Sequence, residues 1–360
     1  MKPRNCPWIP LIVAVLLGAS LACAGEVTFP QAVSTGTASV PDLPTATAAT
    51  KILPVPTGAE CPGGDCANAC LSKLHAIVQN SGSSSARPKV AGQGPGGALA
   101  TVLVTYTVNG DRLGPPKYSD QVPPELTTLQ HDTASQRKIW EYFADIIPPA
   151  DRTELIYYMV STDGKGGMLA SVEQFSGQSK AWALVVDPVD ASKPRDLTFT
   201  LLHEFGHLLT LNSTQVTPDQ AVLEHPNDLR IYAVEAASCP RYFASGGCSL
   251  PNSYINQFFN LFWTKIYAEW SSVNAAKDEP GYLQLLARFY HNHASQFVTP
   301  YSSTSPEEDM AETWAYFILN PKPSADSIAH RKVLFYYSFP ELVHLRDQIS
   351  SNLCAYAATQ

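Results

Sequence analysis

The chain has 360 residues, of which 45% are hydrophobic and 16% are charged, and it carries a formal net charge of −8. This length and composition allow a sizeable buried core. The sequence has no basic block, so nucleic acid is not expected as a partner. No apolar run after residue 25 is long enough to cross a membrane.

Residues 1–24 have the pattern of a signal peptide. Lys2 and Arg4 form a positive start, residues 11–17 are apolar, and an A-x-A cleavage site surrounds Cys23. The alternative is a lipoprotein signal that ends before Cys23, which would then anchor the protein by lipid at a bacterial cell surface. We therefore expect a secreted, extracellular protein or a lipid-anchored one, with this anchor as its sole contact with a membrane.

Residues 25–97 are predicted to be a leader rather than a domain. They are rich in Thr, Ala and Pro and later in Gly and Ser, a composition that favours extended or disordered chain. One Cys-containing segment interrupts this leader, and a short helix is predicted there over residues 69–79. The folded body is expected to occupy residues 98–360.

The cysteines agree with export, because an even number of them in an exported protein is typical of disulfides. Six follow the signal segment: Cys61, Cys66, Cys70, Cys239, Cys248 and Cys354. Cys239 and Cys248 flank a short Gly-containing stretch and are the favoured pair. A metal cluster of the three N-terminal cysteines is the alternative, although their spacing fits no common zinc motif.

The first half of the body is predicted to form a small sheet with one helix. β-branched and aromatic residues indicate strands, and an apolar stripe indicates the helix. The expected strands cover residues 98–108, 155–161, 168–175 and 182–187, and the helix covers residues 133–147. Asn109-Gly110 predicts a turn after the first strand, and Pro148 predicts the end of the helix.

The second half of the body is predicted to be mainly helical. Helices are expected over residues 195–211, 229–237, 252–270 and 282–293, and a further one begins at Ser305-Pro306. The fold class is therefore α+β. His291 and His293 are two residues apart and cannot share a helix face, so they are interpreted as loop or cap residues.

The helix at 195–211 carries His203, Glu204 and His207. Because residues i and i+4 lie on one helix face, both imidazoles can bind one metal ion. This H-E-x-x-H pattern occurs in zinc metallopeptidases, where the Glu acts as a general base. Gly206 costs a helix about 1 kcal/mol relative to Ala, which indicates close approach of another segment. A third ligand has to come from elsewhere.

Glu308 and Glu312 lie one turn apart on the helix that begins at Ser305. One carboxylate can bind the metal while the other accepts a hydrogen bond from a ligating imidazole. The alternative is a capping box, in which Glu308 only reaches back to a backbone N–H near Ser305. Glu235, 28 residues after His207, is the alternative third ligand.

H-E-F-G-H at residues 203–207 and E-D-M-A-E at residues 308–312 together resemble the gluzincin metallopeptidases. Within this group the chain is most similar to the type represented by the anthrax-toxin lethal factor, whose second motif is E-x-x-A-E. The resemblance covers roughly residues 180–320. It implies a zincin-like metallopeptidase domain over residues 98–360, with a small sheet upstream of the H-E-x-x-H helix.

The resemblance also implies one Zn²⁺ ion with His203, His207 and Glu308 as its protein ligands. Glu312 would support a ligand imidazole. Tyr301 stands seven residues before Glu308, at the spacing of a tyrosine that stabilises the transition state in this family. A metzincin is excluded, because the Gly and His that its motif requires after the second His are absent.

The expected activity is hydrolysis of peptide bonds by a zinc-dependent endopeptidase, with a peptide or protein as substrate. Zinc would activate a water, and Glu204 would take its proton. The strand at 182–187 is the candidate to pair with an extended substrate, with an ordinary sheet strand as the alternative. Two other functions stay open: an exported binding module that zinc merely stabilises, and a zinc hydrolase of a non-peptide amide.

Overall fold

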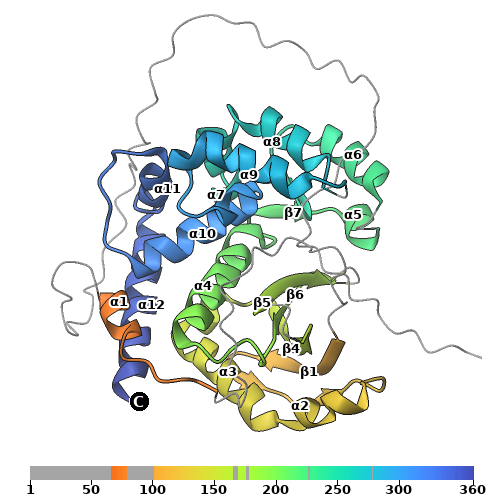
Figure 1. The fold of residues 1–360 in the computed structure, drawn as a ribbon, viewed down its shortest axis with the longest axis vertical. Coiled ribbons are helices and arrows are strands. Elements are labelled where there is room, and N and C mark those ends of the chain that lie inside the picture. Colours follow the sequence, from red (N-terminus) through yellow and green to blue (C-terminus); the bar gives the residue numbers. More distant parts are fainter. Residues whose placement is uncertain (1–65, 79–100, 165–168, 176–177, 226–227, 278) are drawn as a thin grey trace, which may run out of the picture.

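The computed structural model combines a mixed sheet in the first half of the chain with a helical second half (Figure 1). It describes residues 66–78, 101–164, 169–175, 178–225, 228–277 and 279–360. The predicted signal segment with Cys23, the rest of the leader outside residues 66–78, and Cys61 lie outside the described residues. The prediction of a mixed α and β fold with a helical C-terminal half is confirmed.

The main sheet has six strands, and its four longest follow the order β1-β4-β6-β5. Their bounds are Thr101–Asn109 for β1, Leu155–Thr162 for β4, Gln178–Val186 for β6 and Ala170–Phe175 for β5. β4 and β6 are parallel, and the other pairs are antiparallel. The short strands β2 (Arg112–Leu113) and β3 (Lys117–Tyr118) pair with β1, and a turn at Gly110 joins β1 to β2 as predicted.

The prediction that residues 182–187 pair with a substrate is wrong. Residues 182–186 belong to β6, which is hydrogen-bonded to β4 on one side and to β5 on the other, so the alternative of an ordinary sheet strand is confirmed. An interior strand has no backbone groups left for an added strand. The edge of the sheet is β5, which pairs only with β6 among the described strands.

Two helices cover one face of the sheet (Figure 1). Side chains alternate along each strand, so Tyr158 and Leu184 enter the main core while Met159 and Val185 form a small cluster on the other face. Helix α3 (Thr133–Ile146) packs on the main-core face, where the Tyr158 hydroxyl donates to the Gln136 carbonyl at 3.0 Å. α3 ends before Pro148, as the sequence predicts.

Helix α4 (Pro194–Leu211) contains the H-E-x-x-H residues. It begins with Pro at its first position, where a missing N–H costs nothing. It ends at Asn212, whose side-chain amide donates to the carbonyls of Leu208 at 2.9 Å and Leu209 at 3.1 Å. Its side chains are buried on nearly all sides, since it lies between the sheet and a second helix.

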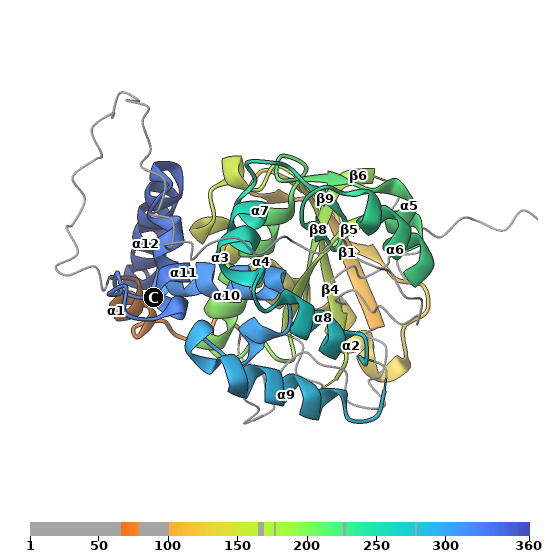
Figure 2. The ribbon, with the colours of Figure 1, turned by 90° about the horizontal axis from the view of Figure 1, so that it is seen from above.

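The second helix is α10 (Pro306–Leu319), which crosses α4 at Gly206 (Figures 1 and 2). A Cβ atom at Gly206 would lie 3.1 Å from Trp314 Cδ1 and 3.2 Å from Ala311 Cα. These distances are closer than ordinary van der Waals contact, so the close approach that the sequence predicts at Gly206 is confirmed.

Several of the remaining helices pack against α10, and a separate three-stranded sheet has the order β7-β9-β8. The other α-helices are α2 (Thr127–His131), α5 (Gln220–Glu224), α6 (Leu229–Ser238), α7 (Tyr254–Phe258), α8 (Tyr267–Asn274), α9 (Tyr282–His293), α11 (Ile328–Tyr336) and α12 (Pro340–Ala358). The small sheet consists of β7 (Val216–Pro218), β8 (Phe243–Ala244) and β9 (Gly247–Ser249).

Two helical predictions need correction. The helix predicted over 252–270 is broken by a π-helical turn at Phe259–Trp263. This break brings Trp263 fully into the core, where its indole N–H donates to Asp309 at 2.8 Å, a long-range contact that overrides the local pattern. His291 and His293 lie in the last turn of α9, inside the helix predicted over 282–293, so the loop interpretation is wrong, while His293 also caps the turn at 294–296.

The Cys-containing segment of the leader packs on the C-terminal helix. Helix α1 (Cys66–Leu71) lies beside α12, and a Cys70–Cys354 disulfide joins them (Figures 1 and 2). The helix predicted over 69–79 is therefore wrong in its bounds. After Leu71 the chain continues as a turn, in which the Ser72 hydroxyl donates to the Ala69 carbonyl at 2.7 Å.

Two disulfides are present among the described cysteines. The predicted Cys239–Cys248 bond is confirmed. The alternative metal cluster of Cys61, Cys66 and Cys70 is wrong, because Cys70 is bonded to Cys354 and has no thiolate to offer. In the described part of the chain, no helix is both long and apolar enough to cross a membrane.

Candidate metal centre

His203 and His207 lie on the face of α4 that meets α10. Both residues are buried, and their Nε2 atoms are 3.1 Å apart. The one-turn spacing on a helix accounts for this convergence, because it places the two rings one above the other. The rings are nearly perpendicular, with an interplanar angle of 80°. Two imidazole nitrogens are therefore directed at one point.

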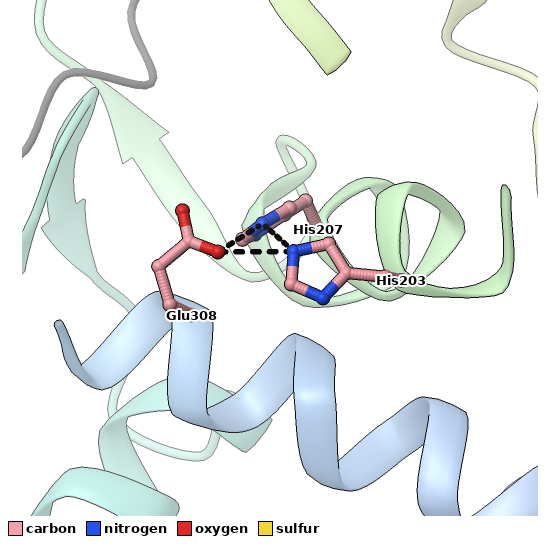
Figure 3. Close-up of side chains that lie close together, drawn as sticks. All are labelled: His203, His207 and Glu308. Carbon is pink, nitrogen blue, oxygen red and sulfur yellow. Dashed lines mark hydrogen bonds and ion pairs between the residues drawn. The ribbon is translucent and has the colours of Figure 1, made fainter. Parts of the chain in front are cut away.

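Glu308 brings a carboxylate to the same point from the first turn of α10 (Figure 3). Its Oε2 atom lies 2.9 Å from His203 Nε2 and 3.4 Å from His207 Nε2. Ser305 caps the helix by accepting the Glu308 backbone N–H at 3.2 Å. The Glu308 side chain does not complete a capping box, because its carboxylate faces the imidazoles.

The three atoms form a triangle with sides of 2.9, 3.1 and 3.4 Å. Two ligands about 2.0 Å from a tetrahedral zinc ion lie about 3.3 Å apart, so the triangle has the size that zinc requires. Two imidazoles and one carboxylate are also a common set of zinc ligands. The group of His203, His207 and Glu308 can therefore hold a metal ion.

The charges of this group stabilise one another. Burial by itself would lower the pKa of His203, but hydrogen bonds and charge from Glu308 and Glu312 outweigh it and raise this pKa well above its usual value. Burial would likewise raise the pKa of Glu308, yet the two imidazoles hold it far below its usual range. Glu308 is therefore ionised at ordinary pH and can offer a carboxylate oxygen to a cation.

Glu312 lies behind His203, one turn further along α10. Its Oε1 atom is 3.0 Å from His203 Nδ1, on the side of the ring away from the metal site. Its other oxygen accepts a hydrogen bond from the Thr299 hydroxyl at 2.6 Å. A carboxylate in this position directs Nε2 of the ligating ring towards the metal. The structure therefore places Glu312 where the sequence predicts.

Glu204 is buried beside the two histidines, at the edge of the sheet. The backbone N–H of Val172 on β5 donates to its carboxylate. Oε2 of Glu204 is buried and has no hydrogen-bond partner among the described residues. Burial raises the pKa of Glu204 to about 7, although the charges of His203 and His207 act against it. A carboxyl group with this pKa can take up and release a proton near neutral pH.

Tyr301 lies beside His203, with the two ring centroids 5.7 Å apart. Its hydroxyl donates a hydrogen bond to the Glu308 carboxylate. Burial and the charges of Glu308 and Glu204 raise the pKa of Tyr301 well above its usual value. The phenol therefore stays protonated and can act as a hydrogen-bond donor at the site.

Other candidate ligands are not part of this group. Glu235 lies on α6 and is not among the described residues that converge here, and neither are His291 and His293. A second group, formed by the carboxylates of Asp163, Asp187 and Asp190, lies at the end of the main sheet. It contains no imidazole, and the buried Asp187 accepts the backbone N–H groups of Asp163 and Val189.

Sequence reasoning missed two carboxylates that flank Glu308. Glu307 accepts hydrogen bonds from the Tyr242 hydroxyl at 2.8 Å and the Ser245 backbone N–H at 3.2 Å. Asp309 is fully buried on a neighbouring face of α10 and pairs with Lys332. The run of three acidic residues at 307–309 was the only sequence signal for these contacts. Such a run is equally well explained by the favourable interaction of negative charge with the first turn of a helix.

Comparison of the chain with family models, with curated proteins and with solved structures finds no match. Its function therefore has to be argued from the residues and geometry of the site.

Proposed function

We propose that this protein is a zinc-dependent endopeptidase of the gluzincin type. The convergence of His203, His207 and Glu308 from two helices, with Glu204 beside them, is the observation that carries this proposal. Three protein ligands leave a position for water or substrate, which is typical of catalytic zinc sites. Glu204 also favours catalysis, because a purely structural zinc site has no use for an adjacent base.

Each residue of the site then has a chemical task. Bound zinc supplies Lewis-acid polarisation of water and of the scissile carbonyl. Glu204 takes the proton from the attacking water through its unpartnered oxygen and later gives it to the leaving amine. Tyr301 donates a hydrogen bond to the negative oxygen that develops in the transition state. Glu312 keeps the His203 ring in its ligating orientation.

Strand β5 gives the substrate a place to bind. It is the edge of the main sheet, and its Val172 N–H already reaches Glu204. An extended peptide that pairs with this edge by β-augmentation would run past Glu204 and the metal ligands. The substrate is therefore a peptide in extended conformation, bound chiefly through its backbone, which favours an endopeptidase over a hydrolase of small amides.

We place this activity outside the cytosol. The Cys70–Cys354 and Cys239–Cys248 disulfides agree with an oxidising compartment. The secretion signal, or the lipid anchor at Cys23, is proposed from the sequence of residues 1–24 alone. Either route brings the enzyme to peptide substrates beyond the membrane.

The decisive experiment compares wild-type protein with Glu204→Gln on a mixed peptide library. The wild type should bind one equivalent of zinc and cleave internal peptide bonds, and a chelator should abolish cleavage. Glu204→Gln should keep the zinc and lose at least two orders of magnitude in kcat, because the base is gone while the ligands remain. Full activity of this variant, or zinc binding without cleavage by the wild type, would refute the peptidase proposal.

A further inference from the structure

Two neighbouring faces of α10 make contact with different parts of the molecule. Glu308 and Glu312 are one turn apart and meet His203 on α4. Asp309 and Thr313, each one residue further along, are also one turn apart and meet helix α11 instead. We call Asp309 and Thr313 the back face of α10. The orientation of α10 about its own axis therefore depends on both sets of contacts.

The principal contact of the back face is a buried ion pair. Lys332 Nζ on α11 lies 2.5 Å from Asp309 Oδ2, and both side chains are completely buried. The same carboxylate oxygen accepts the Trp263 indole N–H at 2.8 Å. The ammonium group also lies over the Phe297 ring, 4.2 Å from its centroid. Asp309 is thus tied to α11 and to the π-helical turn at once.

Tyr336 makes a second contact between the same two helices. It lies one turn after Lys332 on α11, is fully buried, and donates its hydroxyl to the Met310 carbonyl at 2.6 Å. The same hydroxyl is 3.1 Å from Thr313 Oγ1. α11 therefore holds α10 at two consecutive turns, on the residues that directly follow Glu308 and Glu312.

Stability does not explain this ion pair. Removing two charges from water costs so much that apolar residues of similar size are often at least as stabilising. A buried charge is costly to separate from its partner, so the pair disfavours any rotation of α10 that pulls Asp309 and Lys332 apart. Single buried polar residues fix the register of packed helices in coiled coils in a comparable way. What the pair fixes here is the direction in which the preceding residue, Glu308, projects from α10.

The metal site is sensitive to this direction. A carboxylate on a helical side chain lies about 6 Å from the helix axis, so a 10° rotation of the helix moves it by about 1 Å. Bonds to a metal ion tolerate errors of about 0.2 Å. Contacts that fix the rotation of α10 are therefore required for Glu308 to meet His203 and His207.

We propose that Asp309 and Lys332 are positioning residues, whose buried ion pair sets the rotation of α10 and so places Glu308 for metal binding. The proposal rests on the metal centre under "Proposed function" and adds to it a role for residues that touch neither metal nor substrate. The same arrangement predicts that the pair affects zinc affinity more than it affects the stability of the fold.

The test compares two variants with a matched control. Lys332→Met removes the cation but keeps its stem. The double variant Asp309→Asn with Lys332→Met keeps both side-chain sizes and the acceptor for Trp263. Because it removes both charges together, it leaves no unpaired buried charge that could prevent folding. The control is Arg152→Met, which removes another buried cation, one that pairs with Asp111 and lies 5.2 Å from the Trp140 ring centroid, away from α10.

Zinc affinity is measured by competition with a chelator, and unfolding by urea is followed on the apoprotein. In the double variant we expect zinc affinity to fall about tenfold, the lower end of the range for residues that support metal ligands. Arg152→Met should leave zinc affinity unchanged even if it unfolds more readily. Cobalt(II) in place of zinc should show weaker visible absorption in the double variant, because a displaced Glu308 is replaced by water and the site loses its tetrahedral geometry.

Zinc affinity and cobalt spectrum equal to wild type in the folded double variant would overturn the proposal. These readouts do not depend on peptide cleavage, so they separate this inference from the peptidase assignment. If the wild type binds zinc but cleaves no peptide, the assignment fails while the comparison of affinities still decides the role of the pair. If the wild type binds no metal, the metal centre and the positioning role fail together.

Discussion

Glu204 and Glu308 are buried close to the same two imidazoles, yet their pKa values move in opposite directions. Burial dominates at Glu204 and raises its pKa to about 7, whereas the imidazoles prevail at Glu308 and keep it ionised. Neighbouring carboxyl groups with separated pKa values are how enzymes divide the roles of base and permanent anion. At the residue scale, this difference supports the roles proposed for the two residues, which are proton transfer by Glu204 and metal binding by Glu308.

Tyr301→Phe tests the residue proposed to stabilise the transition state. The change removes one donor and leaves the ring, so zinc binding should persist while kcat falls by about two to three orders of magnitude. Steady-state kinetics and a zinc titration measure the two effects. Tyr254→Phe is the matched control, because its hydroxyl bonds the exposed Glu341 instead. Unchanged kcat in Tyr301→Phe would remove this residue from the mechanism.

At the scale of elements, the site depends on how closely α4 and α10 approach. Gly206 lies at their crossing, opposite Ala311 and the fully buried Trp314. A glycine here weakens α4 as an isolated helix, but it lets the two helices bring His203, His207 and Glu308 together. Local helix propensity and tertiary packing therefore oppose each other at this residue, and packing prevails.

Gly206→Ala measures which effect is larger. Helix propensity alone would stabilise the Gly206→Ala variant by about 1 kcal/mol. Overpacking typically destabilises a protein by about 1–3 kcal/mol, and we expect a cost in this range at Gly206. The backbone of Ala311 and the enclosed Trp314 cannot move aside, so we expect net destabilisation in urea unfolding and weaker zinc binding. Ser272→Ala, on the exposed surface of α8, should be neutral or slightly stabilising. A Gly206→Ala protein more stable than wild type would contradict this account.

At the scale of the whole molecule, the two disulfides close loops of very different length. Cys70 and Cys354 are 284 residues apart and join α1 to the C-terminal helix, whereas Cys239 and Cys248 are nine residues apart. A cross-link that closes a longer loop restricts the unfolded chain more strongly. The Cys70–Cys354 bond therefore restrains nearly the entire folded body.

Replacing each pair by serines should separate the two contributions. Chain entropy predicts a loss of about 6 kcal/mol for Cys70→Ser with Cys354→Ser, and of about 3 kcal/mol for Cys239→Ser with Cys248→Ser. Free energies of unfolding from urea titrations of both double variants provide the comparison, and each variant controls for the other. A larger loss on opening the short loop would show that local packing, rather than chain entropy, governs these bonds.

Several features of the protein followed from the sequence alone, because short-range geometry dictates them. The one-turn spacing of His203 and His207 places both rings on one face of any helix, whatever surrounds it. Ser305 and Pro306 mark the start of α10 by the chemistry of helix ends, and Asn212 marks the end of α4. The four long strands of the main sheet and helices α3, α4 and α9 were predictable for the same reason, whereas α11, α12 and the short strands were not predicted.

Only the tertiary structure showed how these helices and strands contact one another. The sequence contains no signal for the sheet order that makes β5 the edge and β6 an interior strand, because strand pairing is a choice among distant partners. The Cys70–Cys354 bond and the Asp309–Lys332 pair likewise depend on residues that meet only in the folded chain. Periodicity is a property of neighbouring residues, whereas contacts across the chain form only when the whole core packs.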